Sequence, residues 1–233
     1  MPIDTAHADL TIYSGGAVKS GLSEAVELFQ KEKGTKIELN FMPMGPLIKK
    51  LDEGLAADIL VLAEDRVPSA ADKIERSAPV EIGRVAIGVA VNEKAAAPDI
   101  STPETFKQAL LAAKSIVYID PARGTSGAHV AKILEQLGIA EQVKAKTTLG
   151  QGGYVVEPVG KGEIELGIHQ ITEILPVKGV KMIGPLPSAL QKETVYQGAI
   201  MSASKNKPEA EDFLKFIRSQ PVRDLFKAKG FLE

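Results

Sequence analysis

Strand-like and helix-like segments alternate along almost the whole chain, and this alternation limits its fold more than any other feature. Short runs rich in apolar and β-branched residues predict strands at 9–13, 36–41, 58–62, 85–91, 116–119, 166–168 and 195–202. Apolar residues at helical spacing predict helices from residue 20 onward and at 47–53, 66–75, 103–113, 126–137, 153–159, 208–217 and 221–228. Alternation of this kind predicts an α/β fold with largely parallel sheets flanked by helices.

Two of the predicted strand-to-helix junctions are rich in glycine and hydroxyl side chains. They are Tyr13-Ser14-Gly15-Gly16-Ala17 and Asp120-Pro121-Ala122-Arg123-Gly124-Thr125-Ser126-Gly127. Each junction directs free backbone N–H groups and the positive end of a helix dipole at the space in front of it. We therefore predict a cleft that binds an anion from both sides. The candidate residues at these junctions are Ser14, Gly15, Gly16, Arg123, Thr125 and Ser126.

Composition excludes several classes of function. The formal net charge is −2, so nothing attracts nucleic acid or an anionic membrane in bulk, and an anion must be attracted locally. The chain has no cysteine, which excludes thiol catalysis, thiolate metal sites and disulfides. Its three histidines are scattered, and no apolar stretch reaches the length of a membrane span. We therefore expect no metal, no cofactor, no nucleic-acid partner and no membrane insertion.

The N-terminus indicates export. Ala6-His7-Ala8 has the small-x-small pattern of a signal-peptidase site and comes directly before the first predicted strand. The charged and apolar parts of a signal peptide do not precede it in this sequence. We interpret residues 1–8 as the remainder of a signal peptide and expect a periplasmic protein; an ordinary N-terminal tail is the alternative.

The chain is expected to cross twice between two lobes. A boundary is predicted near residues 78–80, and a return crossing near 198–202. The first lobe would then be discontinuous, formed by 9–83 with 200–233, and the second would be formed by 84–199. The anion site would lie in the cleft between them.

The order and spacing of several short motifs resemble those of the periplasmic molybdate-binding proteins, which are solute receptors of ABC importers. These motifs extend over nearly the whole chain. They are Ile12-Tyr13-Ser14-Gly15-Gly16-Ala17, Phe29-Gln30-Lys31-Glu32-Lys33-Gly34, Ala56-Ala57-Asp58-Ile59, Ala63-Glu64-Asp65, Leu166-Gly167-Ile168 and Ala228-Lys229-Gly230-Phe231. The resemblance implies a two-lobed type II clamshell that closes on a small anion. It also implies that each lobe is a mostly parallel sheet flanked by helices and that the protein is a monomer.

The resemblance also implies where the ligand donors lie. In this family a tetrahedral oxyanion is held by hydroxyls of the first lobe, and by amides and a tyrosine hydroxyl of the second. Ser14 and Ser126 match two of these positions, and Gln151-Gly152-Gly153 matches the amide loop. The second serine of the first lobe falls at Met44-Gly45, and the tyrosine falls at Gln170, beside His169. This sequence therefore departs from the family at two donor positions.

These departures favour an organic anion. Met42-Pro43-Met44-Gly45-Pro46 offers no hydroxyl, and its two prolines offer no N–H. Arg123 can bind a carboxylate through two hydrogen bonds, and Met44 can pack against a carbon skeleton. We therefore expect a di- or tricarboxylate rather than molybdate or tungstate. The structural alternatives are that Ser14 only caps a helix, that Arg123 pairs with Asp120, and that Met44 belongs to the core.

Two functions would use nearly the same groups. A receptor that delivers a carboxylate to an ABC permease needs only donors, a closing cleft and export. Aconitate isomerases resemble the same family, and an enzyme of that type also needs acid–base groups near the migrating proton. His169 and Tyr154 are the candidates for that role, with Lys19 as a further cation; a packed, structural role is the alternative for both candidates. We favour the receptor, with the isomerase as the main alternative and a cytosolic anion-sensing protein as the third.

Overall fold

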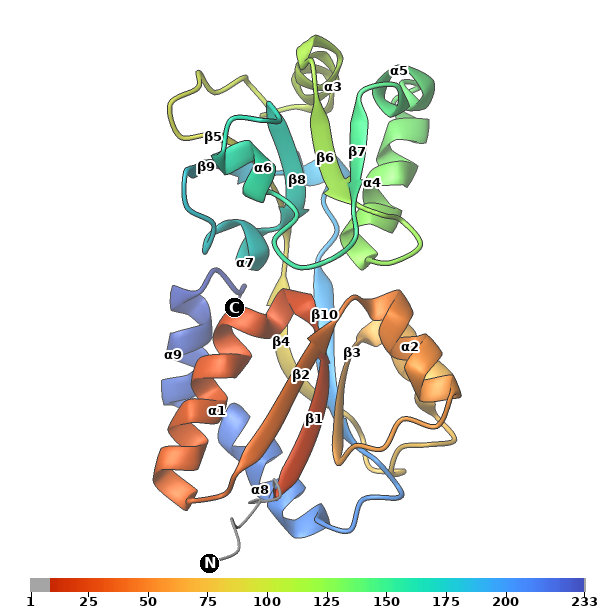
Figure 1. The fold of residues 1–233 in the computed structure, drawn as a ribbon, viewed down its shortest axis with the longest axis vertical. Coiled ribbons are helices and arrows are strands. Elements are labelled where there is room, and N and C mark those ends of the chain that lie inside the picture. Colours follow the sequence, from red (N-terminus) through yellow and green to blue (C-terminus); the bar gives the residue numbers. More distant parts are fainter. Residues whose placement is uncertain (1–8, 233) are drawn as a thin grey trace, which may run out of the picture.

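A computed structural model describes residues 9–232, which form two lobes, each built on a five-stranded sheet (Figure 1). Helices flank both sheets, so the predicted α/β architecture with two lobes is found. The predicted signal-peptidase pattern at residues 6–8 lies outside the described residues. Within the described chain, no helix is both long enough and apolar enough to cross a bilayer.

The first sheet has the strand order β2-β1-β3-β10-β4. Its strands are β1 (Leu10–Gly15), β2 (Ile37–Met42), β3 (Ile59–Ala63), β4 (Val80–Val85) and β10 (Thr194–Ile200). The helices of this lobe are η1 (Gly16–Val18), α1 (Lys19–Lys33), α2 (Met44–Asp52), η2 (Glu64–Ala70), α8 (Lys207–Ile217) and α9 (Gln220–Ala228). The buried face of α1 includes Phe29, whose ring meets that of Phe213 on α8 edge-on, with centroids 5.2 Å apart.

The second sheet has the strand order β7-β6-β8-β5-β9. Its strands are β5 (Ile87–Asn92), β6 (Ile116–Ile119), β7 (Thr147–Gly150), β8 (Leu166–Gln170) and β9 (Val180–Pro185). The helices are α3 (Pro103–Ala112), α4 (Thr125–Gln136), α5 (Ala140–Lys144), α6 (Glu157–Gly160), α7 (Ile171–Ile174) and η3 (Ser188–Leu190). α4 follows β6 and α7 follows β8 directly, so the carboxyl ends of both strands lead into helix starts at the same edge of the sheet.

Both sheets are mixed, and in each of them four of the five strands run in the same direction, in agreement with the predicted mostly parallel sheets. In the first, β1 runs parallel to β2 and β3, whereas β10 is antiparallel to β3 and β4. In the second, β6 runs parallel to β7 and β8, whereas β5 is antiparallel to β8 and β9. The reason lies in the connections between the lobes. β4 carries the chain out of the first lobe and β10 carries it back, so these neighbouring strands run in opposite directions.

The predicted strand at 85–91 is divided between the two sheets. Val85 pairs with Thr194 in the first sheet, and Ile87 pairs with Gln170 in the second. The chain thus crosses between the lobes at Ala86. The apolar run in the sequence does not indicate this crossing, because its residues before and after Ala86 are all buried. Only the strands with which they pair differ.

The crossings refine the expected division into lobes. β10 pairs with β3 and β4 along its length, so residues 194–199 lie in the first sheet, although they were assigned to a second lobe of 84–199. We propose that the first lobe comprises 9–85 and 194–232, and the second 87–193. Both crossings then fall directly before or after a strand of the first sheet.

Several elements differ from the sequence prediction. The predicted helix at 66–75 is the 3₁₀ helix η2, which contains Pro68 and is followed by turns. The predicted helix at 153–159 is reduced to the short α6. β7 and β9 were not predicted, because both are edge strands with mostly part-exposed side chains and lack an apolar run.

Candidate functional site

A cavity of about 140 Å³ lies where the two lobes meet. Both lobes line it: Gly16, Lys19, Met44 and Tyr196 come from the first, and Ser126, Tyr154, Gln170 and Glu173 are among those from the second. It is smaller than the pockets of roughly 300–1,000 Å³ that hold drug-sized ligands. Its size therefore suits a small solute.

The lobes are closed on this cavity. The backbone N–H of Gly45 donates to the carbonyl of Arg123 at 3.0 Å, which joins α2 to the loop before α4. On the other side of the cleft, Thr172 Oγ1 donates to the carbonyl of Ala17 at 2.6 Å. A side chain at Gly45 would overlap the carbonyl oxygen of Ala122, so only glycine permits this approach.

The start of α4 supplies the main anion-binding element. Gly124 precedes the helix in an extended conformation without a side-chain cap, and the first turn carries no acidic residue. The first N–H groups of a helix lack acceptors within it, so those of Thr125 and Ser126 are available at the cavity. Gly127 packs directly against the carbonyl of Ile119, which positions the helix start at the end of β6. This arrangement favours an oxyanion or a carboxylate.

Ser126, His169 and Glu173 form a buried row along one side of the cavity. Ser126 Oγ lies 3.2 Å from His169 Nδ1, and His169 Nε2 lies 3.1 Å from Glu173 Oε2. The His169 and Glu173 side chains are 2% and 10% exposed. The contact between His169 Nε2 and Glu173 Oε2 is short, but its angles are not those of a well-formed hydrogen bond. The row can bind a ligand group and can hold or move a proton.

A second buried row crosses between the lobes. Gln170 Nε2 donates to Thr125 Oγ1 at 3.3 Å, and the Thr125 hydroxyl is hydrogen-bonded to Tyr196 on β10. Burial raises the pKa of Tyr196 far above its usual value, and the hydrogen bond from Thr125 opposes this only in part. Tyr196 therefore remains a neutral phenol at any physiological pH.

The opposite wall is largely apolar and carries one cation. Phe41, Met42 and Met44 line it from the first lobe. Lys19 Nζ lies 5.3 Å from the centroid of the Tyr154 ring, a cation–π contact between the lobes. Burial, followed by the negative charge of nearby Glu173, raises the pKa of the Tyr154 hydroxyl, which keeps it protonated. The carbon skeleton of a ligand could thus pack against this wall, and an anionic group could pair with the positive charge of Lys19.

The structure brings most of the predicted site residues together. Those that line the cavity are Gly16, Met44, Thr125, Ser126, Gly153, Tyr154, His169 and Gln170. Five others lie behind or beside it. They are Ser14, Gly15, Gly45, Arg123 and Gly152.

Each of these five has an identifiable structural partner. Ser14 is fully buried and donates to the carbonyl of Gly15 at 3.0 Å. Arg123 Nε donates to the carbonyl of Gln151 at 2.6 Å and so holds the neighbouring loop, and Arg123 does not line the cavity. Gly45 and Gly152 both face the other lobe; a Cβ at Gly152 would lie 2.5 Å from Pro43 Cγ. Both glycines therefore permit the close approach of the two lobes.

Among the polar side chains that line the cavity, sequence reasoning missed Glu173 and Tyr196; it also missed apolar lining residues such as Phe41 and Ile119. Glu173 stands four residues after His169, but His169 belongs to β8 and Glu173 to α7, so neither helical nor strand spacing indicates in the sequence that the two side chains meet. Tyr196 lies within a predicted strand, but nothing local indicates that this strand returns to the first sheet beside β3. Its place at the cavity follows from the crossing of the chain.

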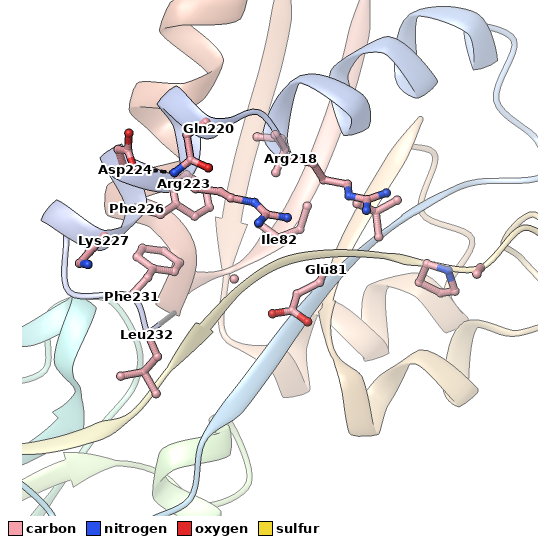
Figure 2. A pocket seen from close by; sticks show the side chains of 15 residues that line it. Glu81, Ile82, Arg218, Gln220, Arg223, Asp224, Phe226, Lys227, Phe231 and Leu232 are labelled. Carbon is pink, nitrogen blue, oxygen red and sulfur yellow. Dashed lines mark hydrogen bonds between the residues drawn. The ribbon is translucent and has the colours of Figure 1, made fainter.

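A larger hollow of about 660 Å³ lies on the first lobe alone, between α9 and β4 (Figure 2). Figure 2 shows Arg223 extending from α9 toward Ile82 on β4. Because only one lobe lines it, closure of the lobes cannot enclose a ligand there. Among residues 9–232, no three histidine, aspartate or glutamate side chains lie together so as to hold a metal ion.

Comparison with known proteins agrees with this architecture. A model of the family described as bacterial extracellular solute-binding protein matches residues 10–232. The chain belongs to this family. A solved structure of the periplasmic molybdate-binding protein of Azotobacter vinelandii superposes with a TM-score of 0.80 at 15% identity, covering 96% of this chain and 99% of the other. The two-lobed fold of periplasmic binding proteins is thereby confirmed for this solute-binding protein.

Two relatives of this solute-binding protein differ in what their names describe. The aconitate isomerase of a Pseudomonas species is 28% identical over 229 residues, covering 95% of this chain and 86% of the relative. The molybdate-binding protein ModA of Escherichia coli strain K12 is 22% identical over 231 residues, covering 95% of this chain and 88% of the relative. The predicted resemblance to both groups is confirmed, and both names refer to small anions.

Proposed function

We propose that this solute-binding protein binds a small di- or tricarboxylate between its lobes and delivers it, in the periplasm, to the permease of an ABC importer. The observation that carries this proposal is the asymmetry of the cavity. N–H groups at the start of α4 are on one side, and the apolar wall of Phe41, Met42 and Met44 is on the other. A ligand with a carboxylate at one end and a carbon skeleton at the other uses both sides.

A free tetrahedral oxyanion fits this cavity less well. It needs hydrogen-bond donors all round, yet the Met42–Pro46 segment supplies thioethers and prolines on the side of the first lobe. Glu173 adds a buried acceptor that disfavours any anion placed beside it, unless His169 or Lys19 compensates. A carboxylate held at α4 keeps its charge near the helix start, with its carbon chain toward the apolar wall.

A thermal-shift screen tests this proposal. Di- and tricarboxylates at 100 times the dissociation constant should stabilise the protein by about 2.7 kcal/mol, which raises Tm by roughly 5–10 °C for a chain of this length. Molybdate, tungstate and sulfate serve as the comparison set and should shift Tm little. Strong stabilisation by molybdate together with no effect of any carboxylate would contradict the proposal.

A second candidate function is an isomerase that moves a proton along a carbon chain of a tricarboxylate. The buried row of Ser126, His169 and Glu173 favours it, because a receptor has no need of an acid–base pair beside its ligand. The relative named as an aconitate isomerase supports the same candidate.

Incubation with trans-aconitate, followed by chromatography for cis-aconitate, distinguishes the two candidates. If the protein is an isomerase, His169→Ala should lower turnover by about 10²–10⁴-fold while trans-aconitate still binds, because the imidazole would transfer the proton. If it is a receptor, the wild-type protein produces no cis-aconitate at micromolar concentration. In that case His169→Ala weakens binding alone.

A further inference from the structure

We propose that the preferred ligand is a hydroxycarboxylate, and that Gln170 selects it by accepting a hydrogen bond from the ligand's hydroxyl group. This inference rests on the proposed function, because it names the class of carboxylate that the same cavity takes. It makes Gln170 a specificity-determining residue.

Gln170 carries an unpaired hydrogen-bond acceptor at the cavity. Gln170 ends β8 and is only 1% exposed. Its Nε2 donates to Thr125 Oγ1, but its Oε1 is buried and has no hydrogen-bond partner among the described residues. Buried side-chain acceptors in folded proteins are nearly always paired, because a bare one is costly. Gln170 lines the cavity, so a ligand can provide the missing donor.

The position of Gln170 specifies where that donor lies on the ligand. Thr125 is the first residue of α4, and the Gln170 amide is hydrogen-bonded to its hydroxyl. The free Oε1 therefore belongs to an amide that contacts the first residue of α4, near the helix start where a carboxylate is expected. A hydroxyl on the carbon next to that carboxylate would reach it, which describes a 2-hydroxy acid.

The chemistry of the cavity favours a hydroxyl over other donors. Molybdate, sulfate and unsubstituted carboxylates offer only acceptors at neutral pH and would leave Gln170 Oε1 unpaired. An ammonium group would bring a charge and three donors. Among the described residues, two that line the cavity have a buried atom without a hydrogen-bond partner, Gln170 Oε1 and His169 Nε2. Of these, only the amide oxygen of Gln170 is restricted to accepting, so a neutral hydroxyl donor satisfies it without bringing a charge.

Calorimetric titration with matched ligand pairs tests the inference on the wild-type protein. L-malate and succinate differ by one hydroxyl group, and so do citrate and tricarballylate. We expect the hydroxylated member of a pair that binds to have a Kd roughly 10- to 100-fold lower, because its partner leaves Gln170 unpaired. L-aspartate, which carries an ammonium group at the same carbon, should bind more weakly than L-malate.

A variant assigns the discrimination to Gln170. Gln170→Leu keeps the size of the side chain but removes the acceptor, so the ratio of the two Kd values should fall to near one. Gln136→Leu is the matched control, because Gln136 is exposed at the far end of α4 and outside the cavity lining, and it should keep the wild-type ratio. If Gln170→Leu does not fold, as judged by circular dichroism, the Kd values of the ligand pairs for the wild-type protein still test the preference for a hydroxyl group.

The outcomes separate this inference from the proposed function. If no carboxylate binds, the proposed function fails. If succinate binds as tightly as L-malate, and tricarballylate as tightly as citrate, carboxylate binding stands and the hydroxyl preference is overturned. Tighter binding of L-aspartate than of L-malate would also overturn it, as would a malate-to-succinate ratio that survives in Gln170→Leu.

Discussion

Gly45→Ala is expected to weaken ligand binding by about 100-fold while leaving the free energy of unfolding unchanged or slightly higher. The two effects have opposite signs because they arise in different states of the molecule. A methyl group at this position overlaps the Ala122 carbonyl oxygen of the opposite lobe, and only in the closed form. The Gly45 N–H bond to Arg123 is lost at the same time.

The stability of the open protein should not suffer. Gly45 lies in α2, and alanine is favoured over glycine within a helix by up to about 1 kcal/mol. Apparent affinity falls in proportion to the closed, binding-competent population, so a 100-fold loss corresponds to about 2.8 kcal/mol against closure. Gly45 is therefore a sensitive probe of closure that spares the fold of each lobe.

Two measurements check this prediction. Calorimetry gives the affinity for L-malate, and small-angle X-ray scattering compares the radius of gyration with and without it. Lys49→Ala, an exposed substitution on the same helix, is the control and should behave as the wild type does. Wild-type affinity in Gly45→Ala, or ligand-induced compaction equal to that of the wild type, would show that this contact does not limit closure.

The sequence predicted those parts of the site that depend on local backbone geometry. The Gly-rich junction before α4 could be recognised because a strand, a small-residue turn and a helix follow one another within a few residues. The end of β8 was placed correctly for the same reason, which located His169 and Gln170 at the cavity.

Side-chain partners far along the chain could not be predicted in this way. Arg123 has the right chemistry for a carboxylate, yet a backbone oxygen 28 residues away binds its guanidinium. Ser14 sits in the predicted turn, but it is the last residue but one of β1 and is fully buried, so it does not line the cavity. The residue type indicates what a side chain can bind, whereas the choice among competing partners is made by tertiary packing.

Asp58→Ala is expected to lower the free energy of unfolding by about 3–4 kcal/mol and Tm by roughly 10 °C. Asp58 is buried directly before β3, where its carboxylate accepts hydrogen bonds from Thr11 N–H at 2.8 Å and Ser204 Oγ at 2.6 Å. Asn206 Nδ2 adds a third bond at 3.3 Å. Hydrogen bonds to a charged group contribute about 1.5–3 kcal/mol each, and removal of the acceptor leaves buried donors unpaired.

The position of these donors explains why the expected loss is large. Thr11 lies on β1, whereas Ser204 and Asn206 follow β10, after the chain has returned from the second lobe. The Asp58 carboxylate therefore joins the N-terminal and C-terminal parts of the discontinuous first lobe. Few local contacts could replace these hydrogen bonds. Asp58→Asn, which keeps one acceptor oxygen but loses the charge, should fall between the wild type and Asp58→Ala.

Thermal and urea unfolding monitored by circular dichroism measure these differences. Asp52→Ala is the matched control, because that carboxylate is 62% exposed and pairs with Lys73 at 3.3 Å. Exposed ion pairs contribute little, so its effect should stay below about 0.5 kcal/mol. An Asp58→Ala protein that melts no lower than Asp52→Ala would refute the role of this carboxylate as the joint of the first lobe. Ligand affinity measured well below Tm should be nearly unchanged in Asp58→Ala, because Asp58 does not line the cavity.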